Sequence, residues 1–91
     1  MSQFFDAISN AVRLQILFEL LENEMYVKKI ADRLERKVEN ISRQLRILRD
    51  NSLLESETRG RYRYYRLRRP TLIKAVQKIY DLLTRREECK K

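Results

Sequence analysis

Several residue types with distinctive chemistry are scarce or missing in this sequence. Its 91 residues include no histidine and a single cysteine, Cys89, so an internal disulfide is excluded and a histidine–cysteine metal site is strongly disfavoured. No nucleophile stands beside a general base, and no glycine-rich loop that would cradle a phosphate is present. We therefore expect no enzyme activity, no cofactor and no metal, and we interpret Cys89 as an incidental thiol in a charged tail.

Long apolar runs are also missing. No stretch of about 18 apolar residues predicts a transmembrane helix, and the first residues lack the basic and apolar pattern of a signal peptide. We therefore expect a cytoplasmic protein that does not use a membrane as a partner. Hydrophobic residues still make up 43% of the chain, which is enough for a core. The length predicts a single domain over residues 1–91.

Positive charge is concentrated in the middle of the chain. Residues 1–35 hold four basic and six acidic side chains, residues 36–69 hold eleven and four, and residues 70–91 hold six and three. The net charges of the three segments are therefore −2, +7 and +3. A local basic block of this kind most often contacts phosphate, so we expect a nucleic acid as partner.

Apolar periodicity, together with the only glycine and the only proline, divides the chain into elements. Gly60 predicts a tight turn, and Pro70 predicts the first turn of a helix. Ser9 and Asn10 offer a cap for a helix that we expect to be central and buried on all sides, because apolar side chains surround it. The predicted helices span about 3–8, 10–23, 28–34, 38–51 and 70–87, and the strands 53–58 and 62–67, with an extended link over 24–27.

The predicted helix over 38–51 has a packing face and a polar face. Val38, Ile41, Leu45 and Leu48 fall on one side, which we expect to be buried. The N-terminal turns of a helix in the major groove approach the base edges, and long basic side chains reach phosphates. The alternative is an ordinary solvated helix face. The residues predicted to contact DNA here are Lys37, Glu39, Asn40, Ser42, Arg43, Gln44 and Arg46.

Six of these side chains have a predicted partner. Asn40 or Gln44 would pair with adenine and Arg43 with guanine. Glu39 would accept from cytosine or repel a misplaced phosphate. Lys37 and Arg46 are better placed for phosphates, which give affinity without sequence information.

The predicted hairpin is rich in arginine and tyrosine. Arginine at its tip, around Gly60, suits a narrow minor groove because the electrostatic potential there is strongly negative. Tyr65 and Leu67 share one face and are predicted to pack inward. The residues of segment 59–66 predicted to contact backbone or minor groove are Arg59, Arg61, Arg63, Tyr64 and Arg66.

The two terminal helices, about 3–8 and 70–87, carry more apolar surface than one small core needs. A two-fold homodimer would bury this excess and place two recognition helices about 34–36 Å apart, which predicts a near-palindromic DNA site. The alternative is a monomer with one longer covering helix. The predicted interface residues are Phe4, Phe5, Ile8, Leu72, Val76, Ile79, Tyr80 and Leu83.

Four segments, in this order and spacing, resemble ArsR-type transcription regulators. Residues 10–17 (NAVRLQIL) resemble the family's P-x-R-x-x-I-L opening, and residues 30–34 (IADRL) its E-L-A-x-x-L helix. Residues 41–48 (ISRQLRIL) resemble its T-V-S-R-H-L-K-V-L recognition helix. Residues 53–55 and 60–67 resemble its G-L-V-x and G-R-x-x-Y-Y-x-L wing, so that the match covers about residues 5–83. The resemblance implies a mainly α fold with a small β-hairpin, a winged helix-turn-helix in the order α-α-(β)-α-α-β-β-α.

The resemblance also implies a function and leaves alternatives open. It implies a homodimeric repressor that binds double-stranded DNA, of the kind that does not sense metals because the Cys and His clusters are absent. Glu35 stands where the family's turn usually has glycine, and Lys37 where serine often caps the recognition helix. Two other classes stay open: an architectural DNA-binding protein with low sequence specificity, and a winged-helix module for protein interaction.

Overall fold

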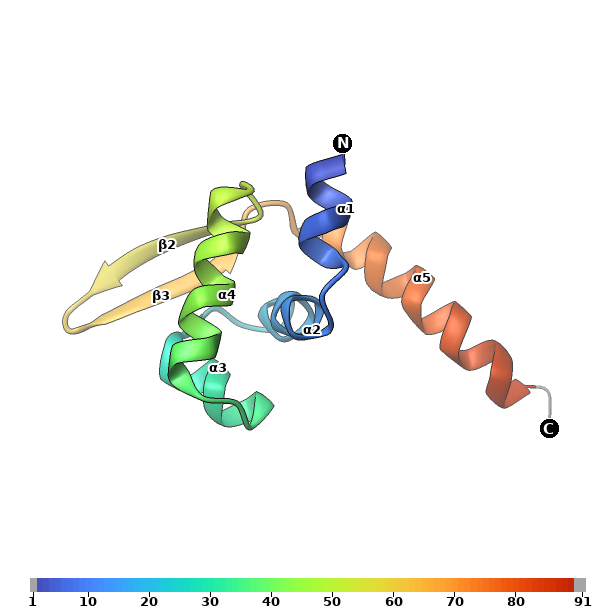
Figure 1. Ribbon diagram of the computed structural model, residues 1–91, viewed down its shortest axis with the longest axis horizontal. Coiled ribbons are helices and arrows are strands. Elements are labelled where there is room, and N and C mark those ends of the chain that lie inside the picture. The colour runs from blue at the N-terminus through green and yellow to red at the C-terminus, as the bar shows by residue number, and fades with distance from the viewer. Residues whose placement is uncertain (1, 90–91) are drawn as a thin grey trace.

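The computed structural model describes residues 2–89 as helices on one side of a small antiparallel sheet, with one long helix that leaves the body (Figure 1). The predicted mainly α architecture and its element order are confirmed. The elements are α1 (Ser2–Ile8), α2 (Ala11–Leu20), β1 (Met25–Tyr26), α3 (Val27–Leu34), α4 (Val38–Asp50), β2 (Leu54–Arg59), β3 (Tyr62–Leu67) and α5 (Pro70–Cys89).

Helix α2 begins at the predicted cap. The side-chain Oδ1 of Asn10 accepts from the backbone N–H of Val12 at 2.9 Å and of Arg13 at 3.1 Å, which satisfies two N–H groups that have no partner inside the helix. The helix ends at Leu20, earlier than predicted, because the next two N–H groups bond to carbonyls only three residues back and tighten the last turn.

Helix α2 crosses the middle of the fold, and its burial is one-sided rather than complete. Ile16, Leu17 and Leu20 are buried, whereas Leu14 and Phe18 are only half-buried. The expectation that all its apolar side chains are enclosed was therefore wrong. Part of the excess is covered by α5, since the rings of Phe18 and Tyr80 pack with centroids 5.6 Å apart.

Helices α3 and α4 form the helix-turn-helix. Glu35 ends α3 in the left-handed conformation, with φ 56°, and the N–H of Arg36 bonds back to the carbonyl of Ala31 at 3.0 Å. Lys37 is the N-cap of α4 and makes no side-chain capping hydrogen bond. Ile41, Leu45 and Leu48 are fully buried and fix α4 to the core.

The sheet has the order β1-β3-β2, with both pairs antiparallel. Gly60, with φ 62°, and Arg61 form the turn between β2 and β3, and Arg59 pairs with Tyr62 across it. Alternation places Leu67 in the core and Tyr65 against it, as predicted. The hairpin of β2 and β3 extends beyond the body as a wing (Figure 1).

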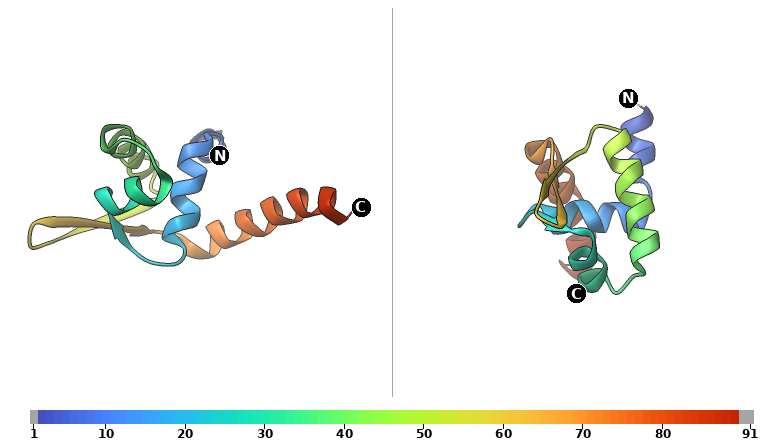
Figure 2. Two further views of the ribbon diagram at one scale, coloured as in Figure 1. Left: turned by 90° about the horizontal axis from the view of Figure 1, so that it is seen from below. Right: turned by 90° about the vertical axis from the view of Figure 1, so that its left-hand side faces the viewer.

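Helix α5 runs away from the body on the side opposite the wing (Figure 2). Ile73 in its second turn is fully buried, and the half-buried Leu72 and Val76 flank the same region. Farther along, Ile79, Leu82 and Leu83 are each more than half exposed. The structure thus leaves much of the apolar surface of α5 without cover from its own chain.

Candidate nucleic-acid interface

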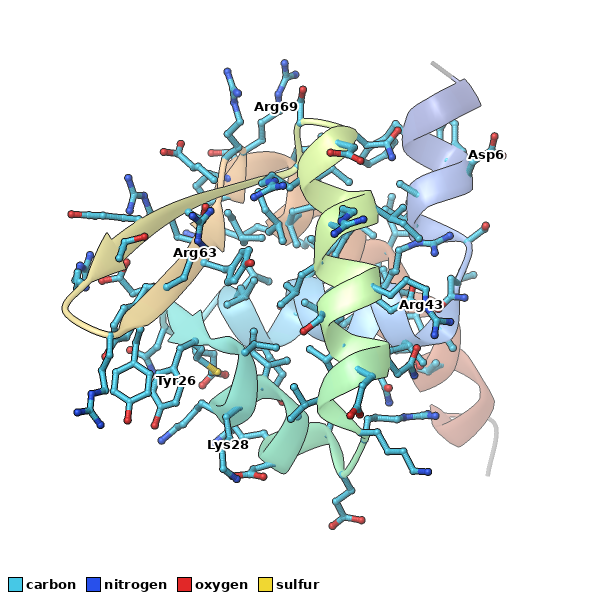
Figure 3. All side chains as sticks on the ribbon, turned by 60° about the vertical axis from the view of Figure 1, so that its left-hand side comes forward. Asp6, Tyr26, Lys28, Arg43, Arg63 and Arg69 are labelled. Atoms are coloured by element: carbon cyan, nitrogen blue, oxygen red, sulfur yellow. The ribbon has the colours of Figure 1, made fainter. Side chains whose placement is uncertain are left out.

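Helix α4 presents one polar face to the outside. Glu39, Ser42, Arg43 and Arg46 are exposed on it, and Lys37 is exposed at its start. Figure 3 shows α4 in front of the other helices, with Arg43 on it and Arg63 on the neighbouring wing. Because the buried face of α4 is anchored in the core, these side chains stand on a rigid element.

Val38 belongs to this outer surface rather than to the packed face. It is 40% exposed, and it lines an open depression of about 440 Å³ together with Glu39, Ser42, Arg43 and Arg46. The prediction that Val38 packs inward was wrong, because at the first position of α4 its side chain borders this depression.

Gln44 is the candidate that the structure separates from the others. It is only 8% exposed, its Oε1 accepts from Nη1 of Arg13 at 2.8 Å, and its Nε2 donates to Oδ1 of Asn40 at 3.0 Å. The expectation that it faces the bases is therefore corrected. At about 100° per residue, Gln44 lies only about 40° from the buried Leu48 around the helix, which the sequence analysis overlooked.

The wing brings its four predicted arginines together, but they differ in what they contact. Arg59 pairs with Glu24 at 2.7 Å and Glu57 at 3.2 Å, and Arg66 pairs with Glu55 and Glu57 at 3.1 Å each. Two arginines have other surroundings. Arg63 donates to the Ser56 hydroxyl at 3.0 Å, and Arg61 at the tip has no ion pair within the part of the chain that the structure describes.

The three acids on this surface were missed from the sequence. The segment 59–69 has no acidic residue, but its partner strand does, and the cross-strand register sets Glu55 opposite Arg66 and Glu57 opposite Tyr64. Reading the predicted hairpin across its strands, rather than along one of them, would have found the two strand residues. Glu24 directly precedes β1 and reaches this surface through the pairing of β1 with β3. No pattern in the neighbouring sequence indicates that position.

The ion pairs keep the wing charges fixed at neutral pH. Hydrogen bonds from Arg59 and then Arg66 hold the pKa of the Glu57 carboxyl below its ordinary value of 4.5. The hydrogen bond with Glu24, and then that with Glu57, raises the pKa of the Arg59 guanidinium. Part of the positive charge of the wing is therefore already neutralised inside the protein.

Three tyrosines form a cluster on the wing. The ring of Tyr26 lies 4.6 Å from that of Tyr62 and 5.6 Å from that of Tyr64, measured between centroids, and Arg59 stands 4.9 Å over the Tyr64 ring. Tyr64 is half-buried in this cluster and Tyr62 is 46% exposed. The cluster gives the outer part of β3, near the turn of the hairpin, aromatic cross-strand support from β1.

The terminal helices carry the predicted apolar set with uneven exposure. Phe5, Ile79, Tyr80 and Leu83 are exposed, whereas the remaining four are half-buried: Phe4, Ile8, Leu72 and Val76. Side chains of α1 and the start of α5 meet around an open pocket of about 450 Å³, which is lined by Phe4, Phe5, Asn51, Ser52, Leu53, Arg69 and Leu72. Leu82, also exposed, was not among the predicted residues.

The part of the chain that the structure describes contains neither a cluster of metal-ligating side chains nor a membrane-spanning helix. Among the side chains that the structure describes, no group of three or more histidine, cysteine, aspartate or glutamate residues is arranged to hold a metal ion. None of the helices in the same part of the chain is both long and apolar enough to cross a membrane.

Comparison with known proteins identifies the family of this chain. The family model described as bacterial regulatory protein, arsR family, matches residues 10–56, slightly more than half of the chain. Among curated protein sequences, no significant match was found.

Solved structures extend the likeness over most of the chain. Reduced HlyU from Vibrio cholerae is 32% identical, with a TM-score of 0.80 over 90% of this chain and 85% of that one. The homodimeric winged helix-turn-helix DNA-binding domain of Mb0332 from Mycobacterium bovis is 30% identical, with a TM-score of 0.82 over 88% and 77%. NolR from Sinorhizobium fredii is 25% identical, with a TM-score of 0.79 over 89% and 81%. The chain therefore belongs to the ArsR family of bacterial regulatory proteins, as a DNA-binding transcription regulator with a winged helix-turn-helix fold and not an enzyme.

Proposed function

We propose that this chain is a homodimeric repressor that binds double-stranded DNA in a sequence-specific manner. In this proposal α4 enters the major groove and the wing contacts the flanking backbone or minor groove. The observation that carries it is the polar face of α4, which is exposed although the helix is fully anchored on its other side. A transcription regulator meets DNA in the cytoplasm, which is the compartment that we propose.

The side chains of α4 differ in their proposed roles. Asn40 pairs with adenine and Arg43 with guanine, because these pairings match the donor and acceptor patterns of the base edges. Glu39 accepts from cytosine, and Ser42 hydrogen-bonds to an adjacent edge. Lys37 and Arg46 contact phosphates, which position the helix in the groove. Mixed polar side chains of this kind favour a regulator over an architectural protein, whose surface needs only positive charge.

The wing supplies contacts that do not depend on sequence. Arg61 at the tip is proposed to enter the minor groove or grip the backbone, and Arg63 to contact phosphate. Arg59 and Arg66 contribute less than their charge suggests because their acidic partners compete with phosphate. Tyr64 keeps a supporting role beside them, within reach of the sugar–phosphate backbone.

The dimer is proposed to form through α1 and α5. The exposed apolar side chains of α5 favour burial against a second copy, and a related protein, Mb0332, is described as homodimeric. A two-fold axis would present two α4 helices to successive major grooves, about 34–36 Å apart, on a near-palindromic site.

Selection of bound fragments from random double-stranded DNA tests the proposal. We expect enrichment of a near-palindrome whose half-sites are about one helical turn apart. Tight binding without an enriched sequence would support an architectural protein instead. Absence of binding at low salt would favour a protein-interaction module.

A further inference from the structure

A chain of side-chain hydrogen bonds connects the end of α1 with the first turn of α4. Arg13 of α2 donates from Nε to the carbonyl of Ala7 at 2.7 Å and from Nη2 to the carbonyl of Asp6 at 3.3 Å. It also donates from Nη1 to Oε1 of Gln44, and Gln44 donates from Nε2 to Oδ1 of Asn40. These contacts use the carbonyls at the last turn of α1, which have no partner inside that helix.

The chemistry of the side chains decides which atom donates and which accepts in each of these hydrogen bonds. A guanidinium only donates hydrogen bonds, so the atom of Gln44 that faces Arg13 has to be its carbonyl oxygen. The other end of the Gln44 amide is then its NH₂ group, which needs an acceptor. Asn40 therefore has to turn its Oδ1 toward Gln44, as observed.

We infer that Gln44 and Arg13 are positioning residues that set the orientation of the Asn40 amide and thereby its base preference. The inference rests on the proposed function, in which Asn40 reads a base. With its oxygen held by Gln44, Asn40 presents its NH₂ group and the second lone pair of Oδ1 to the groove. An outward NH₂ group donates to N7 of a purine, and the remaining lone pair adds an acceptor for N6 of adenine.

Replacing Gln44 with glutamate should reverse the orientation of the Asn40 amide. The new carboxylate still accepts from Arg13, but its second oxygen also accepts and cannot donate to Asn40. Asn40 has to turn its NH₂ group inward to meet it, so its carbonyl oxygen points outward. An outward carbonyl accepts from N6 of adenine or N4 of cytosine and no longer serves N7 of guanine.

The test compares the wild type with Gln44→Glu and Gln44→Met, each with and without Asn40→Ala. The probe is a selected DNA site and its single-base variants. Asn40→Ala first identifies the base pair that Asn40 contacts. At that position, Gln44→Glu is expected to shift the ratio of affinities for guanine over cytosine by about tenfold toward cytosine. The matched control is Gln15→Glu, which adds the same charge at an exposed position of α2.

Three outcomes would overturn the inference. One is an unchanged preference at that position in Gln44→Glu. Another is a change that persists when Asn40 is alanine, since it would then not act through Asn40. Gln44→Met keeps the volume but lacks the amide, and it should lose about tenfold discrimination at the same position; retained discrimination would also overturn the inference.

A measurement on the free protein separates this inference from the proposed function. The side-chain NH₂ protons of Asn40 should exchange with solvent about tenfold more slowly in Gln44→Glu than in the wild type, because they become hydrogen-bonded inward. Equal exchange rates would overturn the orientation argument. If the protein binds no DNA, the proposed function fails, whereas the exchange rates still decide whether Gln44 orients Asn40.

Discussion

At the scale of single residues, similar side chains on this surface have different proposed roles because their neighbours differ. Arg43 is exposed on α4 and directed by a buried helix face, whereas Arg61 stands at the tip of a two-stranded hairpin. A guanidinium on a rigid helix can hold a fixed geometry against a base edge. One at a hairpin tip meets mainly the electrostatic potential of the groove.

The first prediction compares Arg43→Ala with Arg61→Ala. Loss of Arg43 should cost about 1–3 kcal/mol on the preferred site and relax the preference at one base pair. Loss of Arg61 should weaken binding about equally on all sequences. Binding to the selected site and its single-base variants measures both effects. Equal, sequence-blind losses from the two changes would argue for an architectural protein.

The second prediction concerns the acids of the wing. Glu57 pairs with both Arg59 and Arg66 and is ionised at neutral pH, since these partners lower its pKa. Glu57→Gln removes one acidic partner from each arginine, while Glu24 and Glu55 remain. It should raise DNA affinity about threefold to tenfold on every sequence, as expected for about one further phosphate contact at low salt. Glu22→Gln, an exposed acid after α2, is the matched control for charge. Unchanged or weaker binding of Glu57→Gln would show that the acid instead holds the arginines in place.

At the scale of elements, the proposed recognition helix α4 is firmly packed along one face but poorly capped at its N-terminus. Ile41, Leu45 and Leu48 fix its packing, but its N-cap is Lys37, which makes no capping hydrogen bond, and the turn before it holds Glu35 in the left-handed region. A non-glycine residue in that region costs stability. Both features suit a helix whose first turn contacts DNA rather than one selected only for stability.

The third prediction is that a better N-cap at position 37 raises the stability of the protein but lowers its DNA affinity. Lys37→Ser should raise the free energy of unfolding by about 0.5–1 kcal/mol, because a serine hydroxyl accepts from a free N–H of the first turn. The same change should lower DNA affinity, since it removes a phosphate contact. Lys37→Gln removes the charge without supplying a good cap, so it should weaken binding and leave stability unchanged. Thermal unfolding and DNA titration measure the two effects, and unaltered affinity in both variants would remove Lys37 from the interface.

The elements were predictable from the sequence where local signals agree. Asn10 capped α2, Gly60 formed the turn of the wing and Pro70 began α5, because each signal acts within a few residues of itself. Contacts between elements were not predictable in the same way. The sequence predicted Gln44 as a base reader because its hydrogen-bond partner Arg13 lies 31 positions away, and Glu24 reaches Arg59 only through the pairing of β1 with β3.

At the scale of the whole molecule, the distribution of charge and apolar surface separates two functions. The wing and α5 extend from opposite ends of the body, and the whole molecule measures 49 Å along its longest axis. The basic surface of α4 and the wing is thus remote from the exposed apolar part of α5. Such a separation lets a second copy cover α5 without blocking the surface proposed to contact DNA.

The fourth prediction is the salt dependence of DNA binding. Among the side chains that the structure describes, five of the cations predicted to contact DNA make no ion pair: Lys37, Arg43, Arg46, Arg61 and Arg63. A dimer that neutralises about ten phosphates should give a slope of log K against log salt near −9, or roughly 10⁵ in affinity between about 50 and 200 mM. Titrations over this range measure the slope. A value near zero would be incompatible with a DNA-binding surface made of these side chains.

The fifth prediction addresses the apolar surface of α5. Ile79 is 58% exposed in the single chain, so Ile79→Glu should alter the stability of an isolated chain by no more than about 0.5 kcal/mol. In the proposed dimer the same carboxylate would be buried without a partner, which is strongly unfavourable. We therefore expect light scattering to give twice the chain mass of 11.2 kDa for the wild type and the single mass for Ile79→Glu.

Lys74→Glu supplies the control for this change, because Lys74 is exposed and lies about 140° from Ile79 around the helix. It should leave the mass at twice that of the chain. The monomeric variant should still bind one half-site but lose the gain in affinity from joining two half-sites, since its two recognition helices are no longer held at one spacing. A dimeric mass for Ile79→Glu would place the two-fold axis on another surface, and a wild type that is monomeric would leave the exposed face of α5 without the proposed partner.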